Sequence, residues 1–391
     1  MLTTDMVKMG TPSKEHLQFL DHLRGVAILS VFVYHSLGAA FGESQLPWGR
    51  FFSDFHGVSR SFAFLTPVTF GWAGVALFFV ISGFCIHLSF ARSPDHDWNR
   101  FFVRRFFRIF PPYCAALVLF ACFFPTTKVH LDSQAGLSQF ASHLFLVHNL
   151  GEKSFYGINP AFWSIAVEVQ LYLLYPLLLA LVKRVGWARA LLFLGILEIA
   201  LRCFDGVFLT ATGQELPRLA SGLPLYFWFS WAIGAAVADA FIRKSPLPFL
   251  STSWKMWFLF AIFAGMIKPL SSFSFLLFSL ATAAAIAGAL SKSSSESPGW
   301  PRLTSHLGQL GLWSYSFYLL HQPLVLAISS IIAALNVGLH PLLVFALCLG
   351  SYPLVVKISA FSYKYCEVPS MAFGKRFERT KVPYAMLGEK S

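Results

Sequence analysis

Two ionisable side chains lie inside the first apolar segment of the chain, 19–41. Arg24 and His35 are eleven positions apart in the stretch LDHLRGVAILSVFVYHS. In an α-helix this spacing places both on one face, roughly 16 Å apart along the axis. The alternative is a snorkelling arginine and a histidine bonded to a neighbouring helix. Because ionisable groups are costly in an apolar span, the shared face favours a site with a basic or nucleophilic histidine.

A run of basic residues precedes the third apolar segment, 109–125, in RFFVRRFFRIFPPY. Its members are Arg100, Arg104, Arg105 and Arg108. Residues three or four positions apart share a helix face, and a guanidinium group binds phosphate with two parallel hydrogen bonds. An equally good interpretation is a positively charged anchor on the cytoplasmic side of a membrane. The prolines that follow, Pro111 and Pro112, are expected to break the helix.

A carboxylate lies about five residues inside the fourth apolar segment, 162–182. Glu168 in NPAFWSIAVEVQ is at nearly the depth predicted for His35. A carboxylate in apolar surroundings needs a partner, and it could orient the imidazole and stabilise its cation. Tyr172 follows one helical turn later and faces the same way. The alternative partner of Glu168 is a structural group such as Arg202.

Three further features concern packing, a second histidine and the cysteines. Ser82 lies among Gly71, Gly74 and Gly83 in the second segment, 70–90, where small residues favour close helix packing and Ser82 is a candidate cavity residue. His321 in SYSFYLLHQP is either a second polar group of a cavity or a packed core histidine. None of the six cysteines shows metal-site spacing, so they are interpreted as small apolar residues and no metal is expected.

The composition indicates a membrane protein. Of the 391 residues, 56% are hydrophobic and only 12% are charged, about half the charged share of a soluble domain. About 20 apolar residues are needed to cross a membrane as a helix. Segments of roughly this length predict an all-α, polytopic bundle of about ten spans. They are 19–41, 70–90, 109–125, 162–182, 187–204, 222–242, 254–267, 272–290, 309–334 and 341–362.

The distribution of basic residues predicts the orientation. With the N-terminus in the cytoplasm, cytoplasmic segments contain 21 of the 30 Lys and Arg residues and outer segments contain seven, including Arg202. This bias follows the positive-inside rule and places both termini in the cytoplasm. The net charge of +12 therefore reflects topology, and nucleic acid is excluded as a partner. The short apolar segment 137–150 is expected to be interfacial or re-entrant.

The chain resembles the acyltransferase 3 family through short sequence motifs that occur in the family's order from about 17 to 370. The resembling residues are Asp21, Arg24, Gly25 and His35, the phrase GVALFFVISGF, Arg105 and Arg108 before Pro-Pro-Tyr, Trp163, Ser164 and Glu168, the phrase SYSFYLLHQP, and Glu367 with Pro369. The second glutamate common in the family after Glu168 is Val169 in this chain. The matches are individually unspecific, but their shared order makes the resemblance strong.

The resemblance implies transfer of an acyl group, often acetyl, from cytoplasmic acyl-CoA to a hydroxyl of a carbohydrate or glycolipid. Arg24, Arg105 and Arg108 would bind phosphates of acyl-CoA, which is a co-substrate and not a bound cofactor. The pantetheine arm of CoA has about the reach that separates Arg24 from His35. His35 would act as the base or first accept the acyl group, and Glu168 would orient it.

The expected organisation is a cytoplasmic segment 1–18, a transmembrane domain 19–366 and a basic cytoplasmic tail 367–391 in the plasma membrane. Some family members carry an additional extracytoplasmic hydrolase-like domain. This chain is expected to have no room for one, so a separate extracytoplasmic transferase is a candidate partner. The rival functions are a secondary transporter or flippase for a glycan or lipid, with His and Glu as proton relays, and a non-catalytic membrane scaffold.

Overall fold

The computed structural model describes residues 14–42, 60–93, 95–245, 252–291 and 301–378. Its α-helices are α1 (Lys14–Phe41), α2 (Thr66–Thr69), α3 (Gly74–Ala91), α4 (Trp98–Val118), α5 (Gln134–Leu144), α6 (Phe162–Thr212), α7 (Arg218–Ser221), α8 (Trp228–Arg243), α9 (Trp254–Gly265), α10 (Ser274–Ser291), α11 (Pro301–Leu312), α12 (Ser314–Ala334), α13 (Pro341–Gly350), α14 (Tyr352–Ser362) and α15 (Val368–Glu378). These described ranges contain no β-strand. The predicted all-α class is confirmed.

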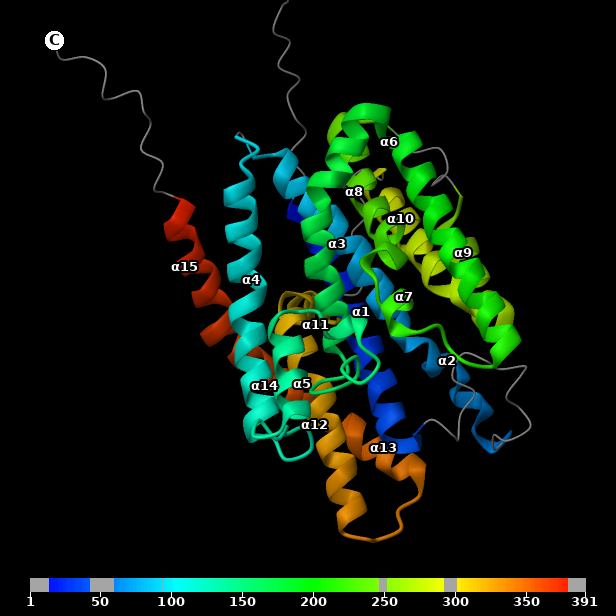
Figure 1. Ribbon diagram of the computed structural model, residues 1–391, viewed down its shortest axis with the longest axis vertical. Helices are drawn as coiled ribbons and strands as arrows, with labels where there is room; N and C mark the ends of the chain where they lie inside the picture. The colour runs from blue at the N-terminus through cyan, green and yellow to red at the C-terminus, as the bar shows by residue number, and fades with distance from the viewer. Residues whose placement is uncertain (1–13, 43–59, 94, 246–251, 292–300, 379–391) are drawn as a thin grey trace, which may run out of the picture.

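Eight helical stretches within the described residues are long and apolar enough to cross a membrane. One of them, α6, covers two predicted spans because it turns back on itself at Gly186, as Figure 1 shows. Gly186 has φ 78°, a conformation that suits glycine because it has no Cβ. The predicted span 254–267 corresponds to α9, which has only twelve residues. The multi-pass helix bundle is confirmed, whereas the count of ten spans stays a prediction.

The third membrane helix begins earlier than predicted. Asp97 caps the N-terminus of α4 by accepting hydrogen bonds from the backbone N–H groups of Asn99 and Arg100. The arginine run therefore belongs to α4 and does not precede it.

The helix α4 also continues through its two prolines. Pro111 has no N–H to donate to the carbonyl of Phe107 one turn back. The Ser370 hydroxyl donates to that carbonyl instead, and the Tyr315 hydroxyl donates to the carbonyl of Ile109 (2.8 Å). The expected helix break at Pro111 and Pro112 is wrong because α4 runs through both prolines, and at Pro111 the Ser370 side chain replaces the lost donor.

The centre of the bundle is formed by α1, α3 and α8, which approach closely at small residues. Added Cβ atoms would collide with the backbone of α1 at Gly74 and with the backbone of α8 at Gly83. Gly234 of α8 has the same relation to the carbonyl of Val80 in α3. The predicted packing role of the glycines in the second span is confirmed. This packing fixes the faces that the central helices turn toward their neighbours.

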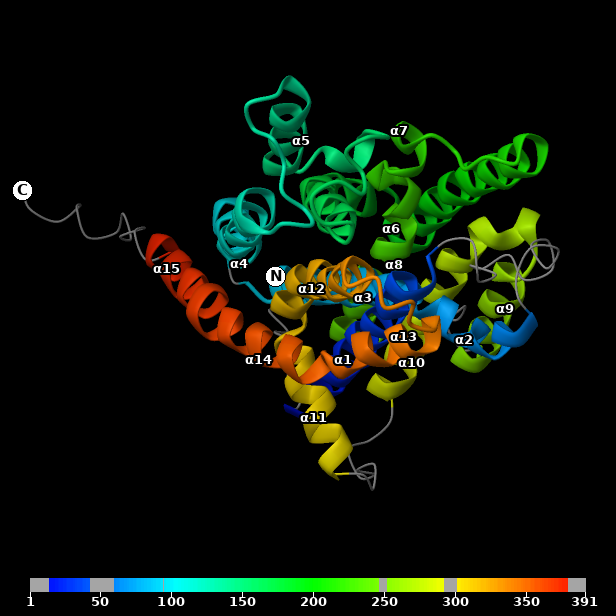
Figure 2. The same ribbon diagram turned by 90° about the horizontal axis from the view of Figure 1, so that it is seen from below.

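The peripheral elements lie around this centre (Figures 1 and 2). The predicted interfacial segment forms α5 and the short turn His148–Leu150 between α4 and α6. The helix α15 packs along α4 and contains the first part of the predicted tail. Most of the predicted segment 1–18 and the tail beyond Glu378 lie outside the described residues. The proposed domain boundaries therefore stay predictions.

A completely buried ion pair joins the second half of α6 to its neighbours. Arg202 donates through Nε and Nη2 to Oε1 of Glu198 (3.0 and 2.7 Å). Its Nη1 donates to the carbonyl of Ser272, and Glu198 also accepts from the N–H and hydroxyl of Ser230 (3.0 and 2.6 Å). The side chain of Arg202, which the count of basic residues above places on the outer side, is buried in the bundle, and its side of the membrane stays a prediction. Arg202 is not the partner of Glu168.

The predicted orientation can be tested with cysteines placed in two exposed loops. Asn99 at the start of α4 and Glu215 after α6 both have exposed side chains. In intact cells, a membrane-impermeant maleimide is expected to label Glu215→Cys and not Asn99→Cys. The exposed native Cys203 is first replaced by serine. Labelling of Asn99→Cys alone would show that the orientation is opposite to the predicted one. Detergent-solubilised protein, in which both cysteines should react, is the control.

Candidate active site

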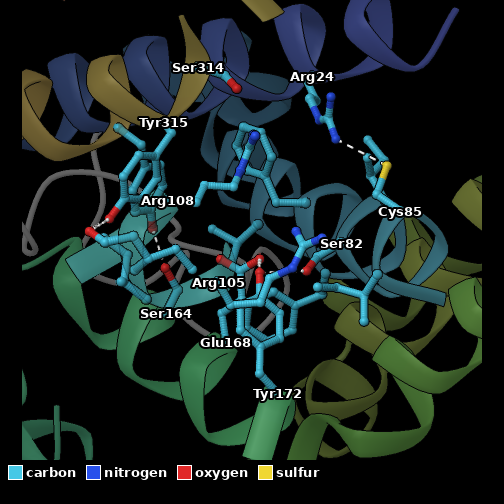
Figure 3. A pocket seen from close by; sticks show the side chains of 18 residues that line it. Arg24, Ser82, Cys85, Arg105, Arg108, Ser164, Glu168, Tyr172, Ser314 and Tyr315 are labelled. Carbon is cyan, nitrogen blue, oxygen red and sulfur yellow. Dashed lines mark hydrogen bonds between the residues drawn. The ribbon is translucent and has the colours of Figure 1, made fainter. Parts of the chain in front are cut away.

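Two adjoining cavities lie between the helices. The inner cavity, shown in Figure 3, lies between α1, α3, α4, α6 and α12. The second lies between α1, α3, α4, α11 and α15. The inner cavity has a volume of about 310 Å³ and the second cavity about 270 Å³, which together suit a small-molecule ligand. Arg24, Cys85 and Arg108 line both. The other polar residues of the inner cavity are Ser82, Arg105, Ser164, Glu168, Tyr172, Ser314, Tyr315 and Tyr318. Five predicted site residues besides Arg24 thus meet in one place: Ser82, Arg105, Arg108, Glu168 and Tyr172.

Two arginines of α4 give the inner cavity its positive charge. The Nε of Arg105 is buried without a hydrogen-bond partner, and its guanidinium lies 5.8 Å from the ring centre of Phe101. Among the described residues, Nη1 of Arg108 contacts the sulfur of Met371, at 3.8 Å. Within the described part of the chain, neither guanidinium has a carboxylate at ion-pair distance. A guanidinium group that lines a cavity without a carboxylate at ion-pair distance favours an anionic ligand there.

Arg24 differs from the α4 arginines because it already has a carboxylate partner. Its Nη1 donates to Oδ1 of Asp21 at 2.8 Å, and its Nη2 contacts the sulfur of Cys85 at 3.1 Å. Arg24 lies at the junction of the two cavities. Its charge is partly offset there, so it offers less attraction to an anion than Arg105 and Arg108 do.

A hydrogen-bonded polar cluster crosses the inner cavity from α6 to α8. The hydroxyl of Tyr172 donates to Oε1 of Glu168 at 2.5 Å and lies 3.2 Å from the hydroxyl of Ser82. Nε1 of Trp231 donates to Ser82 at 3.3 Å. Figure 3 shows Arg105 beside Ser82 and Glu168. The one-turn spacing of Glu168 and Tyr172 produced the predicted shared face.

The partner of His35 is His321 and not Glu168. Nδ1 of His35 lies 2.7 Å from Nε2 of His321, and the ring centres are 5.0 Å apart. The hydrogen bond expected between His35 and Glu168 is wrong, since Glu168 instead accepts from Tyr172. Matching depth in two helices does not make residues neighbours, because helix rotation also decides which side chains meet. The face of α1 that carries His35 packs against α12.

Tyr318 connects the histidine pair to the inner cavity. Its hydroxyl lies 2.7 Å from the hydroxyl of Ser164, and it lines the cavity. Its ring centre is 5.5 Å from that of His321. Neither His35 nor His321 lines the cavity itself. The histidine pair is therefore one side chain away from the space in which Glu168 lies.

Sequence reasoning missed two chemically distinctive residues of the cavities. Cys85 was interpreted as a small apolar residue, but its sulfur contacts Arg24. Its position three residues after Ser82 is the signal that could have placed it on the cavity face. Glu367 lies in a π-helical turn, Tyr363–Glu367, and lines the second cavity while accepting from Ser316 at 2.9 Å. It was noted only in the family resemblance, and its place at the start of the predicted basic tail gave no indication of a cavity.

The fold and the cavity define a multi-pass membrane protein with an arginine-lined polar cavity between its helices. Residues 17–359 match the family model of acyltransferase 3, described as an acyltransferase domain. The chain belongs to this family, and the resemblance inferred from its phrases is confirmed.

Curated relatives of the chain include two O-acetyltransferases and one further acyltransferase. It is 24% identical over 389 residues to the O-acetyltransferase OatA of Staphylococcus aureus (strain NCTC 8325 / PS 47), covering 93% of this chain and 58% of the relative. It is 25% identical over 348 residues to the peptidoglycan O-acetyltransferase OatA of Listeria monocytogenes, covering 80% and 50%. Acyltransferase MdmB of Streptomyces mycarofaciens is 27% identical over 327 residues, with 79% of each chain covered. The chain thus spans between a half and three fifths of the OatA proteins, and no solved structure matches it.

Proposed function

We propose that this chain is a membrane O-acyltransferase that moves an acyl group, acetyl in the first instance, from acyl-CoA to a hydroxyl. The observation that carries the proposal is the inner cavity, where Arg105 and Arg108 lack carboxylate partners. Guanidinium groups that have no carboxylate partner bind phosphates strongly. The family membership favours acyl transfer over the rival transporter, flippase and scaffold functions.

In this proposal the donor extends from the second cavity into the inner one. Arg105 and Arg108 bind its phosphates, and Arg24 assists at the junction of the cavities. Glu168, held by Tyr172, lies on the inner side as a catalytic group. The predicted orientation would make the donor enter from the cytoplasm.

The transfer step needs a base beyond the donor. The acceptor oxygen attacks the thioester carbonyl carbon, the carbon–sulfur bond breaks, and the CoA thiolate leaves and takes up a proton. His35 removes the proton of the acceptor hydroxyl. Alternatively, a ring nitrogen of His35 first takes the acyl group and passes it to the hydroxyl in a second step. The side chain of Tyr318 has to admit the acyl group to the histidine pair in either route.

The acceptor class is proposed from the relatives. The name of the Listeria monocytogenes relative specifies peptidoglycan as its acceptor. We extend this to a carbohydrate or glycolipid hydroxyl presented at the outer side of the membrane. A separate extracytoplasmic transferase would complete the transfer if the acyl group leaves this chain on a carrier.

The most direct test uses purified protein and acetyl-CoA. Release of the free CoA thiol is expected to depend on His35, and acetyl-CoA is expected to bind whether or not His35 is present. The two quantities are measured by a thiol-reactive dye and by calorimetry. Failure to bind acetyl-CoA in a folded protein would contradict the proposal.

Removing the α4 arginines is expected to weaken donor binding more than it slows the chemical step. The loss of one charged phosphate contact costs about 1.5–3 kcal/mol, which is about ten- to a hundredfold in affinity. Arg105→Ala and Arg108→Ala should therefore raise the dissociation constant for acetyl-CoA by that factor. Arg104→Ala is the matched control because Arg104 is exposed on the same helix and lines neither cavity. Unchanged affinity in folded Arg105→Ala and Arg108→Ala would identify the run as a topology anchor.

A further inference from the structure

The hydrogen bonds of His321 define which of its nitrogens carries a proton. Nδ1 of His321 lies 2.9 Å from the carbonyl oxygen of Tyr318 and 3.2 Å from that of Phe317. A carbonyl oxygen only accepts hydrogen bonds, so Nδ1 is the donor. A neutral imidazole has one N–H, which leaves Nε2 of His321 as an acceptor.

This assignment also determines the tautomer of His35. The contact between Nδ1 of His35 and Nε2 of His321 is 2.7 Å long, and it needs one donor and one acceptor. Since Nε2 of His321 accepts, Nδ1 of His35 carries the proton. The lone pair of His35 is then on Nε2, the nitrogen that has no partner in the described structure. When Nε2 takes up a proton, Nδ1–H of the resulting cation still donates to His321, so the same bond serves both states.

The backbone around His321 is fixed by a contact with the start of α6. Pro323 has no N–H, so the carbonyl of Leu319 loses its usual donor within α12. Nδ2 of Asn159 donates to this carbonyl at 2.9 Å, while Oδ1 of Asn159 accepts from the N–H of Ala161 at 3.0 Å. The ring of His321 is completely buried. It therefore has one orientation in which to meet His35.

We propose that His321 is the positioning residue of the reaction: it orients His35 and keeps Nδ1 protonated, so that Nε2 is the reactive nitrogen. The inference rests on the proposed function of His35 in acyl transfer. It reassigns to a histidine the orienting role that the sequence suggested for Glu168. In this geometry the acceptor hydroxyl, or the acyl carbon, reacts at Nε2 of His35, because Nδ1 is occupied by its contact with His321.

Two substitutions of His321 separate hydrogen bonding from packing. His321→Phe keeps a planar ring but removes the acceptor, and His321→Gln restores an acceptor in its side-chain oxygen. An imidazole in the wrong tautomer can cost up to about 10⁴-fold in rate. We expect His321→Phe to lower kcat about 10²–10³-fold with an unchanged KM for acetyl-CoA, and His321→Gln to recover most of the loss.

A spectroscopic measurement tests the tautomer without relying on activity. In protein with ¹⁵N-labelled histidine, His35 is expected to show a protonated Nδ1 and an unprotonated Nε2. The His35 signals are assigned from their absence in His35→Ala, and in His321→Phe they should become those of a mixture. A protonated Nε2 in the wild-type protein would overturn the inference.

The outcomes distinguish this inference from the proposed function. A fully active His35→Ala protein would remove the basis of both. An inactive His35→Ala protein with a fully active His321→Phe protein would overturn only the positioning role. The double variant is expected to be no slower than His35→Ala, since residues acting as one unit show non-additive losses. Acetyl-CoA binding by each variant shows that it is folded.

Discussion

Replacing His35 by alanine is expected to lower the rate of acyl transfer about 10²–10⁴-fold, the usual contribution of a general base. The ring is held by His321, and its Nε2 is free to take the acceptor proton. His35 lies outside both cavities, so acetyl-CoA binding should remain. The measurement is the single-turnover rate of loss of the acetyl thioester, with binding determined separately.

The control for this substitution is another histidine of the same chain. His130 lies in an exposed turn, where its contact with Asp132 is 4.0 Å long. His130→Ala is expected to leave both rate and binding unchanged. A His35→Ala enzyme that keeps the wild-type rate would exclude His35 as base and as acyl carrier.

Breaking the buried ion pair of α6 is expected to produce the largest change in stability. Arg202→Met leaves the Glu198 carboxylate completely buried with only Ser230 as a partner. Removing one member of a buried pair typically costs about 3–5 kcal/mol, because the remaining charge is uncompensated. The free energy of unfolding in detergent should fall by about this amount. The double variant Glu198→Gln with Arg202→Met should recover part of it, since no charge is then left alone.

An exposed pair of the same chemistry provides the matched comparison. Arg218 donates to Glu215 in the segment after α6, where the Glu215 side chain is 58% exposed. Glu215→Gln is expected to change stability by no more than about 1 kcal/mol, as is usual for surface pairs. Equal losses for the buried and the exposed pair would show that burial does not determine the value of the Arg202 contact.

Glu168 illustrates the limit of reasoning from depth along a helix. The shared face with Tyr172 follows from their one-turn spacing and was predicted correctly, since Tyr172 donates to Glu168. The expected contact between Glu168 and His35 was not predicted correctly. The rotation of each helix about its own axis decides which side chains meet, and that rotation depends on contacts elsewhere in the bundle. The contact of Gly74 with the backbone of Ala27, which joins α3 to α1, is one of them.

The sequence alone determined the membrane class, most of the helical segments and the family of this protein. The length of an apolar segment, its helical periodicity and a short sequence motif are local properties. Each can therefore be recognised without knowing which segments pack beside it in the fold. The same local spacing predicted that Arg105 and Arg108 share a face. Only the tertiary structure decided that His35 meets His321, a residue 286 positions away, and that Cys85 contacts Arg24. Helices from distant parts of the chain make these contacts, and their rotation and choice of neighbours depend on packing across the whole bundle.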